Sequence, residues 1–157
     1  MAKAREVPGL HAELPFSEAA AATVRVRVEE LFDAQEGVLD TEDIERVHAM
    51  RVATRRLRAV LEIYRPCFDQ DRYKPVLRDV KALADALGAR RDPDVQLEEL
   101  SALAAAMPRA DLAGIDLLAD EVREEQAQGN ELLGVALAES GRSDLRGRLL
   151  ALVEEPA

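Results

Sequence analysis

Apolar residues recur every three or four positions along most of the chain, a pattern typical of amphipathic helices. A first helix is predicted after Pro15, with Ser17 as its cap and an end near Gly37. Its apolar side would carry four large residues, Val24, Val28, Leu31 and Phe32. The pattern therefore predicts a helix with one face in a core.

A second helix is predicted to begin at Asp40 or Thr41 and to stop before Pro66. One side of it collects mostly apolar residues: Met50, Ala53, Leu57, Val60, Leu61 and Tyr64. At 100° per residue, the opposite side collects four basic residues within an arc of roughly 80°. These residues, named the basic face below, are His48, Arg51, Arg55 and Arg58.

The later helices are predicted over residues 73–88, 92–107, 111–139 and 143–153. Gly88 suits a left-handed helix end, and Asp92 followed by Pro93 is a strong start signal. Arg90 and Arg91 would then lie in a short turn between two helices. Gly129 is expected to break or weaken the longest helix.

Short links between helices favour antiparallel neighbours. The composition agrees, because aromatic residues make up only 3% of the chain, tryptophan is absent and 33% of the residues are charged. We therefore predict an all-α, up-and-down antiparallel bundle of about five to six helices over residues 15–157. Residues 1–14 are predicted to be a flexible N-terminal segment.

Basic charge is concentrated in one third of this acidic chain. Residues 46–91 contain 12 Lys and Arg against 5 Asp and Glu, whereas the rest contains 9 against 26, and the net charge is −10. Like charges at helical spacing repel one another, so the basic face indicates an anionic ligand. The overall negative field disfavours general binding to nucleic acid or to anionic membranes.

A basic groove is predicted if the second and third helices pack side by side. Lys74, Arg78 and Lys81 share one face of the third helix, and Arg90 and Arg91 would close the end of the groove. Arginine can bond two phosphate oxygens at once, lysine adds a compact charge, and histidine adds a contact that depends on its protonation. Repeated cations favour a phosphate chain or a nucleotide over a single carboxylate. Pairing of these cations with neighbouring carboxylates is the structural alternative.

Catalytic and metal-binding signals are absent from the sequence. It contains no GxSxG, Walker-type, GxGxxG or HExxH motif and no cluster with zinc-ligand spacing. We therefore expect no enzymatic activity, no metal and no cofactor. The single Cys67 and the lack of a long apolar stretch indicate a cytoplasmic protein.

Two motifs in this order resemble the CHAD domain, the conserved histidine α-helical domain. The first pattern, HxxRVxxRRLR, is filled by His48, Arg51, Val52, Arg55, Arg56, Leu57 and Arg58. The second, LGxxRDxDV, is filled by Leu87, Gly88, Arg91, Asp92, Asp94 and Val95. The resemblance implies an all-helical fold that binds inorganic polyphosphate. An association with polyphosphate granules is therefore expected.

The resemblance implies a set of polyphosphate ligands: His48, Arg51, Arg55, Arg56, Arg58, Arg78, Lys81 and Arg91. Asp92 and Asp94 would cap a helix and orient Arg91. Arg56 matches the motif but lies about 100° from the centre of the basic face.

A full CHAD domain resembles two related bundles, and no second HxxR motif follows residue 58. A homodimer that completes the two-bundle fold is therefore one hypothesis, and an open, weaker groove is the other. Two other functions stay open: a helical adaptor that docks an acidic protein, and an accessory part of an enzyme that processes polyphosphate or nucleotides. Nucleic acid ranks lower, because the basic face lacks interleaved aromatic residues for base stacking.

Overall fold

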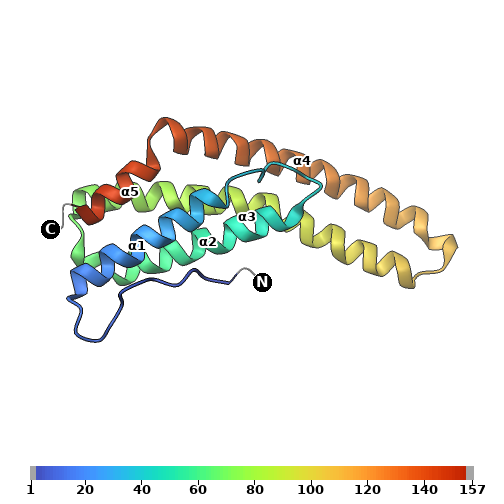
Figure 1. The fold of residues 1–157 in the computed structure, drawn as a ribbon. Helices are drawn as coiled ribbons and strands as arrows, with labels where there is room; N and C mark the ends of the chain where they lie inside the picture. Colours follow the sequence, from blue (N-terminus) through green and yellow to red (C-terminus); the bar gives the residue numbers. More distant parts are fainter. Residues whose placement is uncertain (1–2, 155–157) are drawn as a thin grey trace.

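The computed structural model describes residues 3–154 and is built from helices (Figure 1). The helices are α1 (Phe16–Asp33), α2 (Ile44–Ile63), α3 (Gln70–Ala106), α4 (Leu112–Arg142) and α5 (Leu145–Glu154), with short 3₁₀ turns at Arg65–Cys67 and Arg109–Asp111. The predicted all-α bundle is confirmed, with five helices in the described part. No helix within that part is long and apolar enough to cross a membrane.

The core lies between α1, α2, α3 and α5, with a contribution from the C-terminal half of α4. The predicted apolar sides of α1 and α2 face it, and Val24, Met50 and Leu57 have no exposed surface. The last helix, α5, packs against α1 and brings Leu149 and Leu152 into the same core. Burial of these side chains, each contributing about 1.5–3 kcal/mol, is what holds the helices together.

One continuous helix, α3, replaces the two helices predicted over residues 73–107. It begins at Gln70, where the Asp69 carboxylate accepts hydrogen bonds from the backbone N–H groups of Asp71 (3.1 Å) and Arg72 (3.0 Å). Gly88 lies inside the helix rather than at its end. The predicted break at Gly88 and Pro93 is therefore wrong.

Packing against α4 offsets the cost of Pro93 inside α3. Proline has no N–H to donate to the carbonyl of Ala89, four residues earlier, and such a site costs about 3 kcal/mol in an exposed helix. Here Pro93 is buried, and the fully buried Arg90 donates to the Asp94 carboxylate across the proline. The axis of α3 changes direction where its colour passes from green to yellow (Figure 1).

The predicted weakening of the long helix at Gly129 is also wrong, because α4 continues through it. Gly129 is buried at the closest approach of α4 to α3. A Cβ atom at this position would lie 2.6 Å from the Ala89 carbonyl oxygen and 3.0 Å from the Arg90 Cα. The Ala89 carbonyl, which has no N–H partner at Pro93, faces α4 at this point. Only glycine leaves room for it between the two helices.

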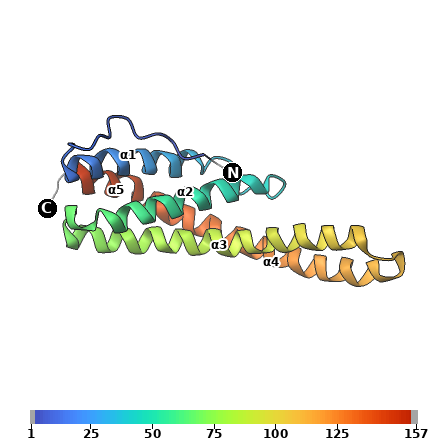
Figure 2. The same cartoon turned by 90° about the horizontal axis from the view of Figure 1, so that it is seen from below.

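The distal parts of α3 and α4 form a hairpin that projects beyond the other helices (Figures 1 and 2). The main apolar core contains no residue between 88 and 132. Four large apolar side chains of this hairpin are exposed: Leu103, Met107, Leu117 and Leu118. Within residues 3–154, the hairpin therefore consists of two helical segments that no third helix covers.

The segment before α1 lies against that helix. Its Arg5 backbone N–H donates to the Glu30 carboxylate, the Arg27 guanidinium donates to the Arg5 carbonyl at 2.6 Å, and Arg5 pairs with Asp33 at 2.7 Å. The predicted cap at Ser17 is wrong: α1 begins at Phe16 and no side chain caps it. The boundary at residue 14 and the predicted flexibility stay predictions, and residues 1–2 and 155–157 lie outside the described residues.

Replacing Gly129 with alanine should destabilise the fold. The added methyl must displace the backbone of α3, and we expect a loss of about 1–3 kcal/mol in the free energy of unfolding, measured by urea denaturation. Gly114→Ala, in the same helix but with open space around the added methyl, is the control and should be neutral or stabilising. Equal effects of the two substitutions would contradict the close approach.

Candidate functional site

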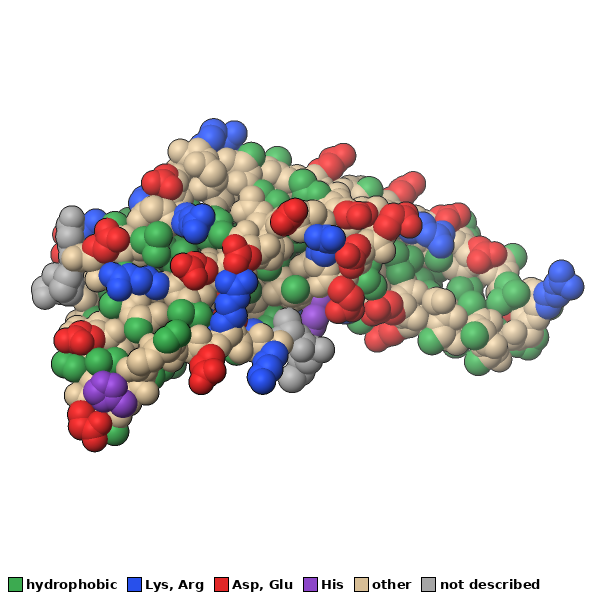
Figure 3. Space-filling view, viewed as in Figure 1, with side chains coloured by type: hydrophobic (Ala, Val, Ile, Leu, Met, Phe, Trp, Pro, Cys, Tyr) green, Lys and Arg blue, Asp and Glu red, His purple; other side chains and the backbone are tan. Residues whose placement is uncertain are grey.

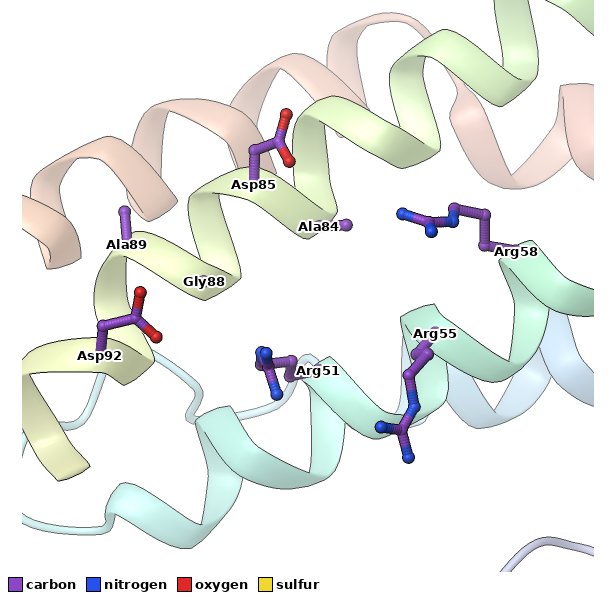
Figure 4. Close-up of a pocket in the computed structure, with 8 residues that line it drawn as sticks. All are labelled: Arg51, Arg55, Arg58, Ala84, Asp85, Gly88, Ala89 and Asp92. Carbon is purple, nitrogen blue, oxygen red and sulfur yellow. The ribbon is translucent and has the colours of Figure 1, made fainter.

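An open cavity of about 430 Å³ lies between α2 and α3. Its α2 wall carries Arg51, Arg55 and Arg58 from the basic face. The residues of its α3 wall are Ala84, Asp85, Gly88, Ala89 and Asp92. Figure 4 shows Arg51 and Arg58 extending into the space between the two helices, whereas Arg55 points away from α3. This cavity is called the arginine groove below.

Helical spacing explains how the groove forms. The fully buried Val47, Leu57 and Leu61 fix one side of α2 against the core, so residues on the opposite side face outward. On α3, the alanine and glycine residues have side chains too short to fill the space. A Cβ atom at Gly88 would meet no heavy atom within 4 Å. Arg51 and Arg58 thus face a wall in which three of the five residues are alanine or glycine, and this leaves room for a ligand.

Two of the three arginines have no anionic partner within residues 3–154. No hydrogen bond or ion pair joins Arg51 or Arg55 to a described residue, and both are exposed. Arg58 has one partner, Glu62, one turn along the same helix at 3.5 Å. In a chain of net charge −10, guanidinium groups left unpaired in one cavity are available to an outside anion.

His48 and Arg56, also predicted as ligands, do not line the groove. His48 is half-buried one turn before Arg51 on α2. Arg56 is half-buried and its guanidinium lies 3.9 Å from the Glu30 carboxylate on α1. Glu30 also accepts a hydrogen bond from the buried Arg27. Arg56 thus lies on the α1 side of α2, as its position off the basic face indicated.

The α3 residues of the predicted site lie outside the cavity lining. Arg78 and Lys81 are exposed, and Arg78 lies 3.5 Å from the Asp79 carboxylate. Arg91 is half-buried and has two longer pairs, with Glu98 at 3.6 Å and Asp94 at 4.0 Å. Of the eight predicted ligands, the structure brings Arg51, Arg55 and Arg58 together in one cavity.

Arg90 does not close the groove, contrary to prediction. It has no exposed surface, and its Nε donates to the Asn130 side-chain oxygen at 3.2 Å on α4. Asp94, predicted as a cap, is 1% exposed inside α3 and accepts from Arg90 and from Gln126 at 2.7 Å. The second motif therefore fastens α3 to α4, and Asp92 alone of its two aspartates faces the groove.

This fastening was not predicted from the sequence, although a signal for it exists. Arg90 and Asp94 are four residues apart, and so are Gln126 and Asn130, which is the spacing of one helix face. Asn130 extends the network by donating to the Leu39 carbonyl at 3.0 Å in the loop before α2. Contacts between α3, α4 and that loop thus hold α3 in place on the side that faces away from the arginine groove.

Acidic side chains gather along α4 and the projecting hairpin on the face shown in Figure 3. Residues 95–125 contain eight Asp and Glu and two Arg, a local charge of −6. The acidic segment of the sequence thus forms most of the projecting hairpin, whereas the three arginines of the groove belong to α2.

The family model for the CHAD domain matches residues 22–157, which is most of the chain. The chain therefore belongs to the CHAD domain family. Among solved structures, PptA from Streptomyces chartreusis has a similar fold, with a TM-score of 0.70 and 18% sequence identity over 91% of this chain. This chain spans about half the length of PptA, 51%. A search of the curated proteins gave no match.

Removing the Asp94 carboxylate should test the buried network. Asp94→Ala leaves the Arg90 charge buried without its partner, and we expect a loss of about 3–5 kcal/mol in the free energy of unfolding. Replacing both residues, Arg90→Met with Asp94→Leu, should recover most of that loss because no charge stays buried. Asp120→Ala, which breaks an exposed pair with Arg123, is the control and should cost well under about 1 kcal/mol. A stable Asp94→Ala protein would show that the network contributes little.

Proposed function

We propose that this protein binds inorganic polyphosphate, or a related oligophosphate, in the arginine groove without enzymatic turnover. The observation that carries this proposal is that three arginines line one open cavity and two of them, Arg51 and Arg58, extend into it, while Arg51 and Arg55 have no anionic partner among the described residues. The chain belongs to the CHAD family, and its resemblance to that family implies polyphosphate binding. The family therefore supports the same ligand.

The spacing of the arginines favours a linear ligand with repeated charges. Arg51 and Arg58 are seven residues apart on α2, a rise of about 10 Å along the helix axis. A single carboxylate or phosphate bound at one end of this row leaves the arginine at the other end unoccupied. A phosphate chain carries negative oxygens along its whole length, so it can occupy the row and extend toward His48 or toward Lys81 and Arg78.

Among the described residues, the lining of the groove contains no serine, threonine, cysteine, lysine or histidine that could act as a hydroxyl, thiol, amine or imidazole nucleophile. This lining consists of arginine, aspartate, alanine and glycine. Burial raises the pKa of the Cys67 thiol, so less of the reactive thiolate is present at neutral pH, and this residue lies at another cavity, beside Phe68 and Leu152. These features favour a binding protein over a hydrolase.

A titration of the purified chain with long-chain polyphosphate, compared with single-stranded DNA of matched charge, tests the proposal. At physiological salt we expect saturable binding to polyphosphate and weak binding to DNA, because the groove has no aromatic platform for bases. Phosphate release measured in parallel should stay at the background level. Binding to an acidic peptide together with indifference to polyphosphate would favour the adaptor function instead.

Replacing Arg51 and Arg55 by alanine should weaken polyphosphate binding by at least about tenfold, since each charge-assisted contact contributes about 1.5–3 kcal/mol. The slope of log affinity against log salt should fall by about 1.4, by analogy with single-stranded nucleic acids. The control is Arg109→Ala with Arg142→Ala, which removes the same charge from exposed sites outside the groove. Equal losses from both pairs would show that only the overall charge matters.

We also propose that two copies associate through the projecting hairpin. Leu103, Met107, Leu117 and Leu118 are exposed there, and a two-helix hairpin can bury such residues only against a further helix. A second hairpin would supply two more helices and complete a four-helix arrangement. The local charge of −6 opposes this contact, so association should strengthen as salt screens the repulsion.

Sedimentation velocity at micromolar concentration should detect a dimer that strengthens with salt. Leu117→Gln with Leu118→Gln should shift the protein to monomer without changing its helix content measured by circular dichroism. Leu132→Gln, an equally exposed site of α4 nearer the bundle, is the control and should leave the dimer intact. A wild-type protein that stays monomeric at all salt concentrations would contradict this proposal.

A further inference from the structure

Two carboxylates share the arginine groove with the three guanidinium groups. Asp85 and Asp92 both line the cavity from α3, seven residues apart on the same face of that helix. Both are exposed. The charges lining the cavity therefore sum to +1, not the +3 that the arginines alone would give.

The aspartates of the groove do not form ion pairs with its arginines. Among residues 3–154, no hydrogen bond or ion pair joins Asp85 or Asp92 to any partner, including the arginines across the cavity. In Figure 4, the Asp92 carboxylate lies on the wall opposite Arg51, whereas the Asp85 carboxylate lies on the side of α3 that is turned away from α2. Unpaired groups of both signs thus line one open space.

A phosphate chain without bound cations is complementary in charge to the arginines of this lining but not to the aspartates. Its oxygens are attracted by Arg51, Arg55 and Arg58, but they would be repelled by Asp92 on the facing wall and, from farther away, by Asp85. A phosphate chain that carries divalent cations presents both signs of charge. Magnesium in particular keeps several water ligands and is commonly bound by one or two protein carboxylates together with the phosphates of a ligand.

We propose that the arginine groove recognises polyphosphate as its magnesium complex. The proposal rests on the function proposed above and specifies the form of the ligand. Arg51, Arg55 and Arg58 contact phosphate oxygens, while Asp85 and Asp92 contact Mg²⁺ ions on the chain, directly or through their water ligands. The aspartates then select the metal-loaded chain and reject the bare one.

Affinity for long-chain polyphosphate should be measured with Mg²⁺ and with EDTA at constant ionic strength. For the wild-type chain, we expect Mg²⁺ to strengthen binding by at least about fivefold, within the usual range for coupled ligands. For Asp85→Asn with Asp92→Asn, we expect tighter binding of the bare chain than wild type shows. In that variant Mg²⁺ should weaken binding, because it neutralises the phosphates that the arginines attract.

The matched control is Glu99→Gln with Glu124→Gln, which removes the same charge from exposed positions of α3 and α4 outside the groove. It should respond to Mg²⁺ as wild type does. If Mg²⁺ weakens binding equally in all three proteins, the arginine groove takes the bare chain and this inference is wrong, although the proposed function stands. If no protein binds polyphosphate under either condition, the proposed function itself fails. Circular dichroism verifies that each variant is folded.

Discussion

The contact between α3 and α4 at Gly129 is the constraint on which the other features of the structure depend. Pro93 leaves the Ala89 carbonyl free, glycine lets α4 approach it, and the buried Arg90 and Asp94 bond across the proline. These contacts keep α3 helical over 37 residues despite two internal prolines. A break here would separate the groove wall at Asp92 from the rest of α3 and would release the hairpin beyond it.

The two faces of α3 near this contact have different neighbours. One face holds the buried Arg90 and Asp94 against α4, and the half-buried Asn130 continues this network to the loop before α2. The other face presents Gly88 and Asp92 to the arginine groove. The orientation of the groove wall is therefore set by polar contacts on the side that no ligand reaches. Residues of one sequence motif serve both purposes because a helix turns by about 100° per residue.

Periodicity alone predicted the helical class, the core side of α2 and the basic face, because each depends on residues within one helix. The breaks predicted at Gly88, Pro93 and Gly129 failed for a common reason: a second helix supplies the contacts that local propensity lacks. Arg90 was misplaced with them, since its burial depends on α4. The groove was predicted as basic on both sides, and Asp85 and Asp92 on its α3 wall emerged only from the packing of α2 against α3.

The pairing of α1 with α5 joins the two ends of the described chain in one core. During synthesis, α1, α2 and the first half of α3 leave the ribosome before Leu149 and Leu152, which cover part of their apolar surface, have been made. Until α5 has been made, the nascent α1, α2 and first half of α3 thus carry apolar residues that α5 will later cover. Uncovered apolar surface of this kind promotes aggregation of a nascent chain, independently of any ligand.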